Sequence, residues 1–217
     1  MPVRKVRNHG NNIIGKFPSR KMERMISFES TIERDYLFIL DYESNVTSIE
    51  EQPLTIEYRH EGKVRHYTPD FHFLRNGQRI LTDCKPSALV NDPENKIKFS
   101  AAYEFCQEYA WQFEVVTDTD LRSGFRLQNI KLLTRHASYN VRPEIKAQIF
   151  ALLLSWTSPR TIREFQQIIR SDPSQPDTLI QTCLLQMAFH HEIALSLEHA
   201  PISGQSLVYL PSTLPTI

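Results

Sequence analysis

The pattern of hydrophobic and polar positions in the first half of the chain predicts three strands, at residues 54–60, 63–73 and 79–85. Gly62 follows the first stretch and Asn76-Gly77 follows the second, where tight turns are expected. The pattern therefore predicts consecutive strands joined by hairpins.

Segments with the residue pattern of helices lie before and after these strands in the sequence. Ser30 precedes residues 31–40, whose apolar positions form one stripe at about 100° per residue. Farther along, Asp92 followed by Pro93 is typical of a helix start, and this helix is expected to end near residue 109. Residues 111–116 again read as a strand. The order strand, helix, strand predicts an α/β core in which this last strand joins the sheet.

One acid, Glu33, falls inside the apolar stripe of the first helix. A carboxylate is costly to bury without a cation or hydrogen-bond donors, so a partner such as a metal ion is expected. The alternative is a capping box, in which Glu33 only bonds back to the backbone amide of Ser30.

The predicted hairpin carries further acids. Asp83 and Lys85 share one face of their strand, and the hairpin brings Asp70 beside them. Mg²⁺ prefers oxygen ligands and usually takes one or two protein carboxylates, which suits Asp70 and Asp83, with Mn²⁺ as a substitute. The Cys84 carbonyl is a candidate further ligand, and Lys85 is placed to orient a water or offset phosphate charge. The alternative is a turn acid at Asp70 and an exposed Asp83–Lys85 ion pair.

Helical patterns dominate after residue 142. Residues 144–156, 161–170 and 175–190 read as three helices, followed by strand-like pieces at 193–197 and 206–210. This order is the outline of a winged helix. Its acids outnumber its basic residues by six to four, a balance of −2, so a protein-contact role is favoured over DNA binding. The alternative is a segment that only caps the preceding core.

Composition narrows the class of protein. The chain has 217 residues, of which 41% are hydrophobic, enough for one core and a small second domain. Its longest apolar run, 149–154, is too short to cross a membrane, and no hydrophobic signal segment follows Met1, so a cytoplasmic protein is expected. The three scattered cysteines fit neither a disulfide framework nor a zinc site.

Basic residues gather at the start of the chain. Residues 1–25 hold seven of them against one acid, a balance of +6, which predicts an arm that follows phosphates. For each of the other candidate phosphate contacts, a solvated helix or loop charge is the favoured interpretation. His72, on the same face as Asp70, is expected to pack across strands more than to touch substrate. The arm residues are Arg4, Lys5, Arg7, Lys16, Arg20, Lys21 and Arg24, and the other candidates are Lys96, Lys98, Arg122 and Arg126.

Taken in order, these residues resemble the TnsA family, nuclease subunits of heteromeric cut-and-paste transposases. The resemblance runs through the Glu33 helix, residues 45–53, Tyr67-Thr68-Pro69-Asp70-Phe71, Asp83-Cys84-Lys85-Pro86, and 120–122 leading into 129–133. It implies a restriction-endonuclease-like PD-(D/E)xK core over 26–142, after the arm at 1–25, and a winged-helix-like domain over 143–217. By position, the catalytic residues become Glu33, Asp70, Asp83 and Lys85, with Glu33, Asp70, Asp83 and Cys84 at the metal.

The resemblance also implies a biological role. TnsA-like subunits cut the 5′ strands at transposon ends, while a TnsB-like transposase cuts and joins the 3′ strands. A TnsC-like ATPase regulator is the expected partner of the C-terminal domain, and association with the nucleoid is expected during activity. Two rival interpretations remain: a free-standing restriction or repair nuclease that uses the same site, and an assembly adaptor that has lost cleavage.

Overall fold

The computed structural model describes residues 13–169 and 178–211, and these divide into two compact units after Ser123. Three of the predicted arm residues, Arg4, Lys5 and Arg7, lie outside the described residues. The same holds for Arg170 and Gln175, at the predicted ends of two helices.

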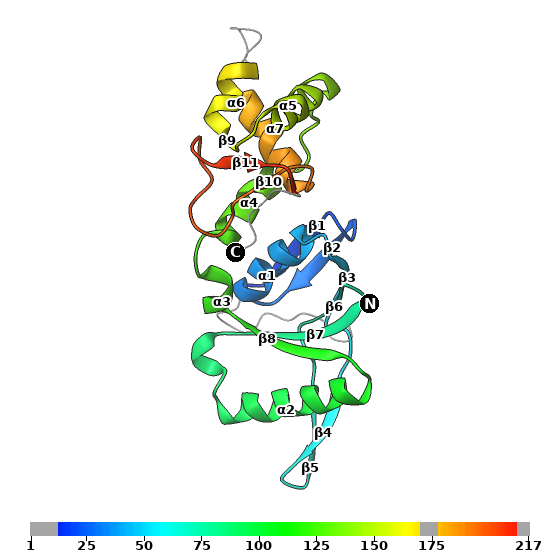
Figure 1. The fold of residues 1–217 in the computed structure, drawn as a ribbon. Helices are drawn as coiled ribbons and strands as arrows, with labels where there is room; N and C mark the ends of the chain where they lie inside the picture. The colour runs from blue at the N-terminus through cyan, green and yellow to red at the C-terminus, as the bar shows by residue number, and fades with distance from the viewer. Residues whose placement is uncertain (1–12, 170–177, 212–217) are drawn as a thin grey trace. The chain divides into compact units, whose positions relative to one another are not determined.

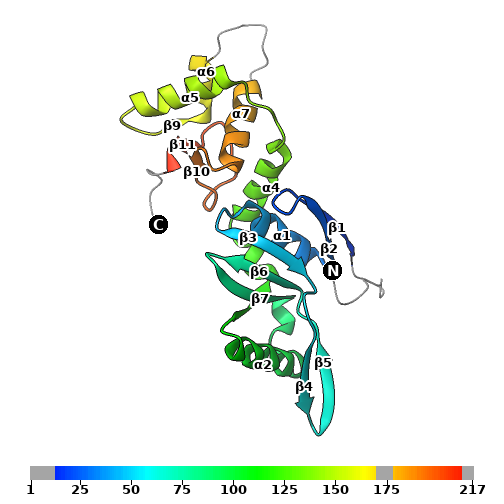
Figure 2. The same ribbon diagram turned by 90° about the vertical axis from the view of Figure 1, so that its right-hand side faces the viewer.

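A mixed four-stranded sheet forms the centre of the first unit (Figure 1). Its strand order is β3-β6-β7-β8, antiparallel except for the parallel pair β7 and β8. One helix lies on each face, α1 on one side and α2 on the other, as both views show (Figures 1 and 2). The prediction of an α/β core is confirmed. The bounds are α1 Thr31–Tyr42, β3 Val46–Glu51, β6 Phe71–Arg75, β7 Gln78–Lys85, α2 Pro93–Glu108 and β8 Gln112–Thr117.

The turn between β6 and β7 sets the register of the sheet. Asn76 and Gly77 have φ values of 52° and 77°, as a two-residue turn with two left-handed residues requires. The turn pairs Arg75 with Gln78, and pairing continues to Phe71 opposite Thr82. One step farther, the Asp70 amide donates to the Thr82 carbonyl at 3.0 Å. The predicted hairpin is confirmed, and it brings Asp70 level with Asp83.

The single strand predicted over 63–73 is wrong, because two strands occupy this range. β5 (Lys63–Tyr67) pairs with β4 (Ile56–His60) in a separate two-stranded hairpin that projects from the sheet (Figure 1). Pro69 separates β5 from β6, and proline has no N–H to donate to a strand ladder. The break lets Tyr67 and Asp70 belong to different sheets while remaining close along the chain.

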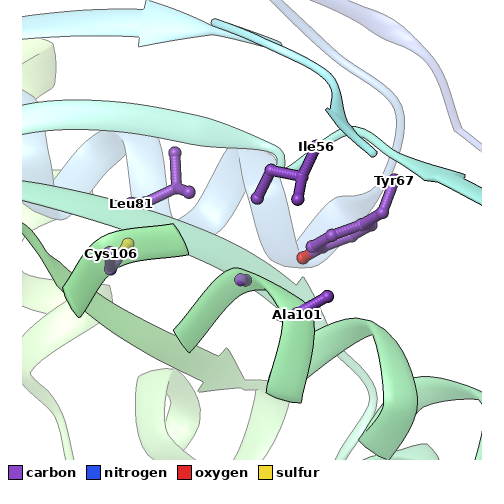
Figure 3. Packing of buried hydrophobic residues seen from close by; sticks show 6 residues of the cluster. Ile56, Tyr67, Leu81, Ala101 and Cys106 are labelled. Carbon is purple, nitrogen blue, oxygen red and sulfur yellow. The ribbon is translucent and has the colours of Figure 1, made fainter. Parts of the chain in front are cut away.

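Helix α2 packs against the sheet through small side chains. Leu81 of β7 and Ala102 of α2 are fully buried, and Cys106 is almost so. Ile56 and Tyr67 of the projecting hairpin complete this cluster, which Figure 3 shows between α2 and the strands. The helix therefore holds the hairpin as well as the sheet.

The segment predicted as a basic arm is, from Gly15 onward, part of the fold. Strands β1 (Gly15–Ser19) and β2 (Arg24–Phe28) form a hairpin, and β1 packs against α1. Lys21 Nζ donates to the Val46 carbonyl at 2.7 Å, and the Arg24 guanidinium lies 2.7 Å from the Glu51 carboxylate. These two charges are therefore used inside the protein.

Four helices and a small three-stranded sheet make up the described part of the second unit. The strands pair antiparallel in the order β10-β11-β9. Within the described residues, no helix is both long and apolar enough to cross a membrane. The bounds are α4 Arg126–His136, α5 Pro143–Ser155, β9 Arg160–Thr161, α6 Ile162–Ile169, α7 Thr178–Phe189, β10 Ala194–Leu195 and β11 Leu207–Tyr209.

The two units divide after Ser123, whereas the sequence places the division after Arg142. Helix α4 accounts for the difference, because it packs on α7 and fully buries Ile130 and Leu133. Its buried Asn129 donates to the Leu197 carbonyl at 2.8 Å. The sequence analysis assigned no helix to this stretch, which belongs to the core of the second unit.

Candidate active site

A cavity of about 640 Å³ lies in the first unit, at the carboxyl end of β7. Its wall contains all four residues predicted to be catalytic. Glu33 comes from the first turn of α1, Asp70 from the residue before β6, and Asp83 and Lys85 from β7. Residues separated by more than 50 positions in the sequence therefore meet in one place.

Asp83 and Lys85 form a pair whose acid is buried. The Asp83 residue is 2% exposed, and Lys85 Nζ lies 3.1 Å from its Oδ2. This contact is within ion-pair distance, yet Oδ2 has no hydrogen-bond donor among the described residues. The pair thus differs from the exposed ion pair considered as an alternative, because its acid is a buried residue of the cavity wall.

Asp70 is held by the main chain of the neighbouring strand. The Cys84 backbone amide donates to Asp70 Oδ2 at 2.6 Å. Burial raises the pKa of the Asp70 carboxyl well above its usual range, and the charges of Asp83 and Glu33 raise it further. A group in this position is stable as a carboxylate only when a cation is near.

Glu33 reaches a different amide from the one that a capping box requires. Ser30 does cap α1, since its Oγ accepts from the Glu33 amide at 3.1 Å. The Glu33 carboxylate, however, accepts from the backbone amide of Glu29 at 2.7 Å. Burial raises the pKa of the Glu33 carboxyl, the Glu29 amide and the Ser30 hydroxyl oppose the rise, and the charges of Glu29 and Asp83 add to it. Glu33 is therefore buried and electrostatically linked to the other acids.

The donor set fits a divalent cation. Four acids and two lysines line the cavity, a formal charge of −2 that one divalent ion balances. Carboxylate oxygens are the ligands that Mg²⁺ prefers, and it retains several waters. Among residues 13–169 and 178–211, no three acidic, histidine or cysteine side chains form a ready-made cage. The charged wall residues are Glu29, Glu33, Asp70, Asp83, Lys85 and Lys98.

Tyr67, named earlier only as part of a motif, was not predicted to belong to the site. Its ring belongs to the cluster under α2, and its side chain also lines the cavity. The buried hydroxyl has no hydrogen-bond partner within the described residues. Burial raises the pKa of the Tyr67 phenol, and the charges of Asp83 and Asp70 raise it further. No pattern in the sequence singles it out, because the adjacent His66 lines the cavity as well.

The remaining residues predicted to contact phosphate or substrate differ in where their side chains lie. The His72 ring stacks on Trp111 with centroids 4.8 Å apart, a packing role, and burial lowers its pKa. Arg122 lies 3.0 Å from Asp35, so its charge is used inside the first unit. Lys96 is exposed, whereas Lys98 lines the cavity.

Arg126 is also used internally, within the second unit. Its guanidinium lies 2.8 Å from the Glu198 carboxylate. Neither Arg122 nor Arg126 therefore offers an unpaired charge to phosphate.

Comparison with known proteins gives one finding. Residues 43–118 match the family model for the TnsA-like endonuclease N terminal domain. The match includes Asp70, Asp83 and Lys85 and begins after Glu33. No curated protein matches the chain. The chain is therefore TnsA-like over residues 43–118, and it is a nuclease related to transposition.

Proposed function

We propose that this protein is the Mg²⁺-dependent endonuclease subunit of a heteromeric transposase, and that it cuts the 5′ strands at transposon ends. The observation that carries the proposal is the meeting of Glu33, Asp70, Asp83 and Lys85 around one cavity. Acids that are buried together in this way need a cation, and a metal that also binds phosphate meets that need.

Asp70 and Asp83 are the proposed metal ligands, with Glu33 and the Cys84 carbonyl as further oxygen donors. The Cys84 amide fixes the Asp70 carboxylate, and an extended residue turns its N–H and C=O toward the same side, so the carbonyl faces Asp70 as well. Bound Mg²⁺ would supply Lewis-acid stabilisation of the phosphate charge and a more acidic water.

Lys85 has the proposed role of orienting the attacking water. Its ammonium is anchored at Asp83, and the nearby carboxylates raise its pKa despite burial, so it stays charged. In-line attack on phosphorus then breaks the bond to the 3′ oxygen. The products are 5′-phosphate and 3′-hydroxyl ends.

The second unit is proposed to be a winged-helix-like partner-binding domain. Its order, helix α5, strand β9, helices α6 and α7, then strands β10 and β11, is typical of winged helices. The acidic balance from Pro143 onward is unfavourable for DNA, so we assign this domain to a TnsC-like regulator. A TnsB-like transposase would then bring the DNA ends.

An excision assay tests the proposal. Transposon-end DNA, the TnsB-like transposase and Mg²⁺ are combined with wild type or with Asp70→Asn, and each broken strand is mapped. We expect the variant to lose the 5′-strand cut by at least about a hundredfold while 3′-strand cuts persist. Glu104→Gln, an exposed acid on α2, is the control and should cut normally.

Three results would overturn the proposal. Unchanged 5′ cutting by Asp70→Asn would remove the catalytic assignment. Cutting of end DNA by the purified protein without transposase would favour the free-standing nuclease. Absence of any cut with all partners present, together with normal complex assembly by Lys85→Ala, would favour the adaptor.

A further inference from the structure

Lys98 occupies an unexpected face of helix α2. It precedes the buried Ala101 by three residues and the buried Ala102 by four, so it shares their sheet-facing side. Lys96, two residues earlier, points about 200° away around the helix and is exposed. Two lysines of one helix therefore lie in opposite environments.

The environment of Lys98 is the cavity wall. The residue is partly buried and lines the cavity with the four acids and Lys85. Among the described residues, no carboxylate lies within ion-pair distance of its ammonium. An ammonium group that lines an acidic cavity without a carboxylate partner is available to an anion from outside the protein.

The two lysines of the cavity are used differently. Lys85 lies 3.1 Å from Asp83, and its charge also lowers the pKa of Asp70. Lys98 reaches the cavity wall from α2 and forms no ion pair among the described residues. Its charge is therefore available to an anion that enters the cavity.

We propose that Lys98 binds a phosphate of the DNA strand beside the bond that is cut. This inference rests on the proposed nuclease function and adds a substrate-binding residue to it. The four acids and Lys85 alone give the wall a formal charge of −3, which repels a phosphodiester, and Lys98 reduces that charge to −2. Lysine acts here as a point charge, so it holds the strand without reading its sequence.

A binding experiment isolates this contact from the chemistry. A fluorescent oligonucleotide duplex is titrated with full-length protein in Ca²⁺, which replaces Mg²⁺ and suppresses cutting, at several salt concentrations. We expect Lys98→Ala to weaken binding about tenfold and to reduce the slope of log affinity against log salt by about 0.9. Lys96→Ala is the matched control and should match wild type in both respects. Lys98→Arg keeps the charge and should retain most of the affinity.

Calorimetric titration with Ca²⁺ alone separates failure of the inference from failure of the proposed function. Lys98→Ala should bind Ca²⁺ at least as tightly as wild type, because it removes a positive charge from the cavity wall, whereas Asp70→Asn should bind it more weakly. Equal DNA affinity of wild type and Lys98→Ala, including binding by neither, would overturn the inference alone. Equal Ca²⁺ affinity of wild type and Asp70→Asn would overturn the metal site. A loss of DNA binding by Lys96→Ala as large as that by Lys98→Ala would also overturn the inference.

Discussion

At the scale of single residues, this protein is governed by acids that folding places out of water. Burial and mutual repulsion raise the pKa of the Asp70 and Glu33 carboxyls, and only a few donors oppose the rise. Alternation along β7 was enough to predict that Asp83 and Lys85 share a face. The Glu29 amide as the partner of Glu33 could not be predicted, because it depends on how the chain enters α1.

The raised pKa of Asp70 has a consequence for stability without metal. The folded state holds the Asp70 proton more tightly than the unfolded state does. The stability that this proton contributes is complete below pH 3.8 and is lost as the pH rises toward the folded pKa. We therefore expect Asp70→Asn to raise the free energy of unfolding of the metal-free protein at pH 7 by at least about 1 kcal/mol, or about 2–4 °C in Tm.

Thermal unfolding in EDTA from pH 4 to pH 8 measures this effect. The difference between Asp70→Asn and wild type should grow with pH, since asparagine still accepts from the Cys84 amide. Glu104→Gln serves as the control. If Asp70→Asn were less stable than wild type at pH 7, the prediction would be contradicted.

At the scale of elements, the β6–β7 hairpin determines the geometry of the site. Alternating residues and the Asn76-Gly77 pair were sufficient to predict it. The division of residues 63–73 at Pro69 was missed because the alternation continues across the break. Helix α4 was missed although its buried Leu127, Ile130 and Leu133 recur at the spacing of an amphipathic helix, whose apolar face packs on α7.

Replacement of the turn glycine tests the role of this hairpin. A Cβ at Gly77 meets no atom within 4 Å, so Gly77→Ala adds only the strain of a left-handed φ, about 1 kcal/mol. We expect urea denaturation to show that Gly77→Ala lowers the free energy of unfolding by this amount. Gly62→Ala has the same local strain in the β4–β5 hairpin, which projects from the sheet and opens more easily, so its loss should be smaller. A larger loss for Gly62→Ala would contradict this assignment.

At the scale of the whole molecule, the chain consists of two units with separate cores. The change of composition after residue 142 indicated a second unit but placed its start too late, because α4 resembles a connecting segment until its burial is known. The unit boundary predicts that a fragment ending at Ser123 keeps the site. A fragment ending at Arg142 would carry α4 without α7 and would expose Ile130 and Leu133.

Two fragments distinguish these boundaries. We expect residues 1–123 to remain monomeric in size-exclusion chromatography and to bind Mn²⁺ within about threefold of the full chain, since every wall residue of the cavity lies in this range. Residues 1–142 should self-associate through the exposed face of α4. If residues 1–142 stayed monomeric and residues 1–123 self-associated, the boundary at Arg142 would be supported.

The three free cysteines are all buried, two in the first unit and one in the second. Burial raises the pKa of the Cys84, Cys106 and Cys183 thiols, so the folded chain offers alkylating reagents almost no thiolate. Each sulfur becomes reactive only when its surroundings open. The three native cysteines therefore report local opening without any introduced label. Mass spectrometry after timed exposure to iodoacetamide would measure how often β7, α2 and α7 each open.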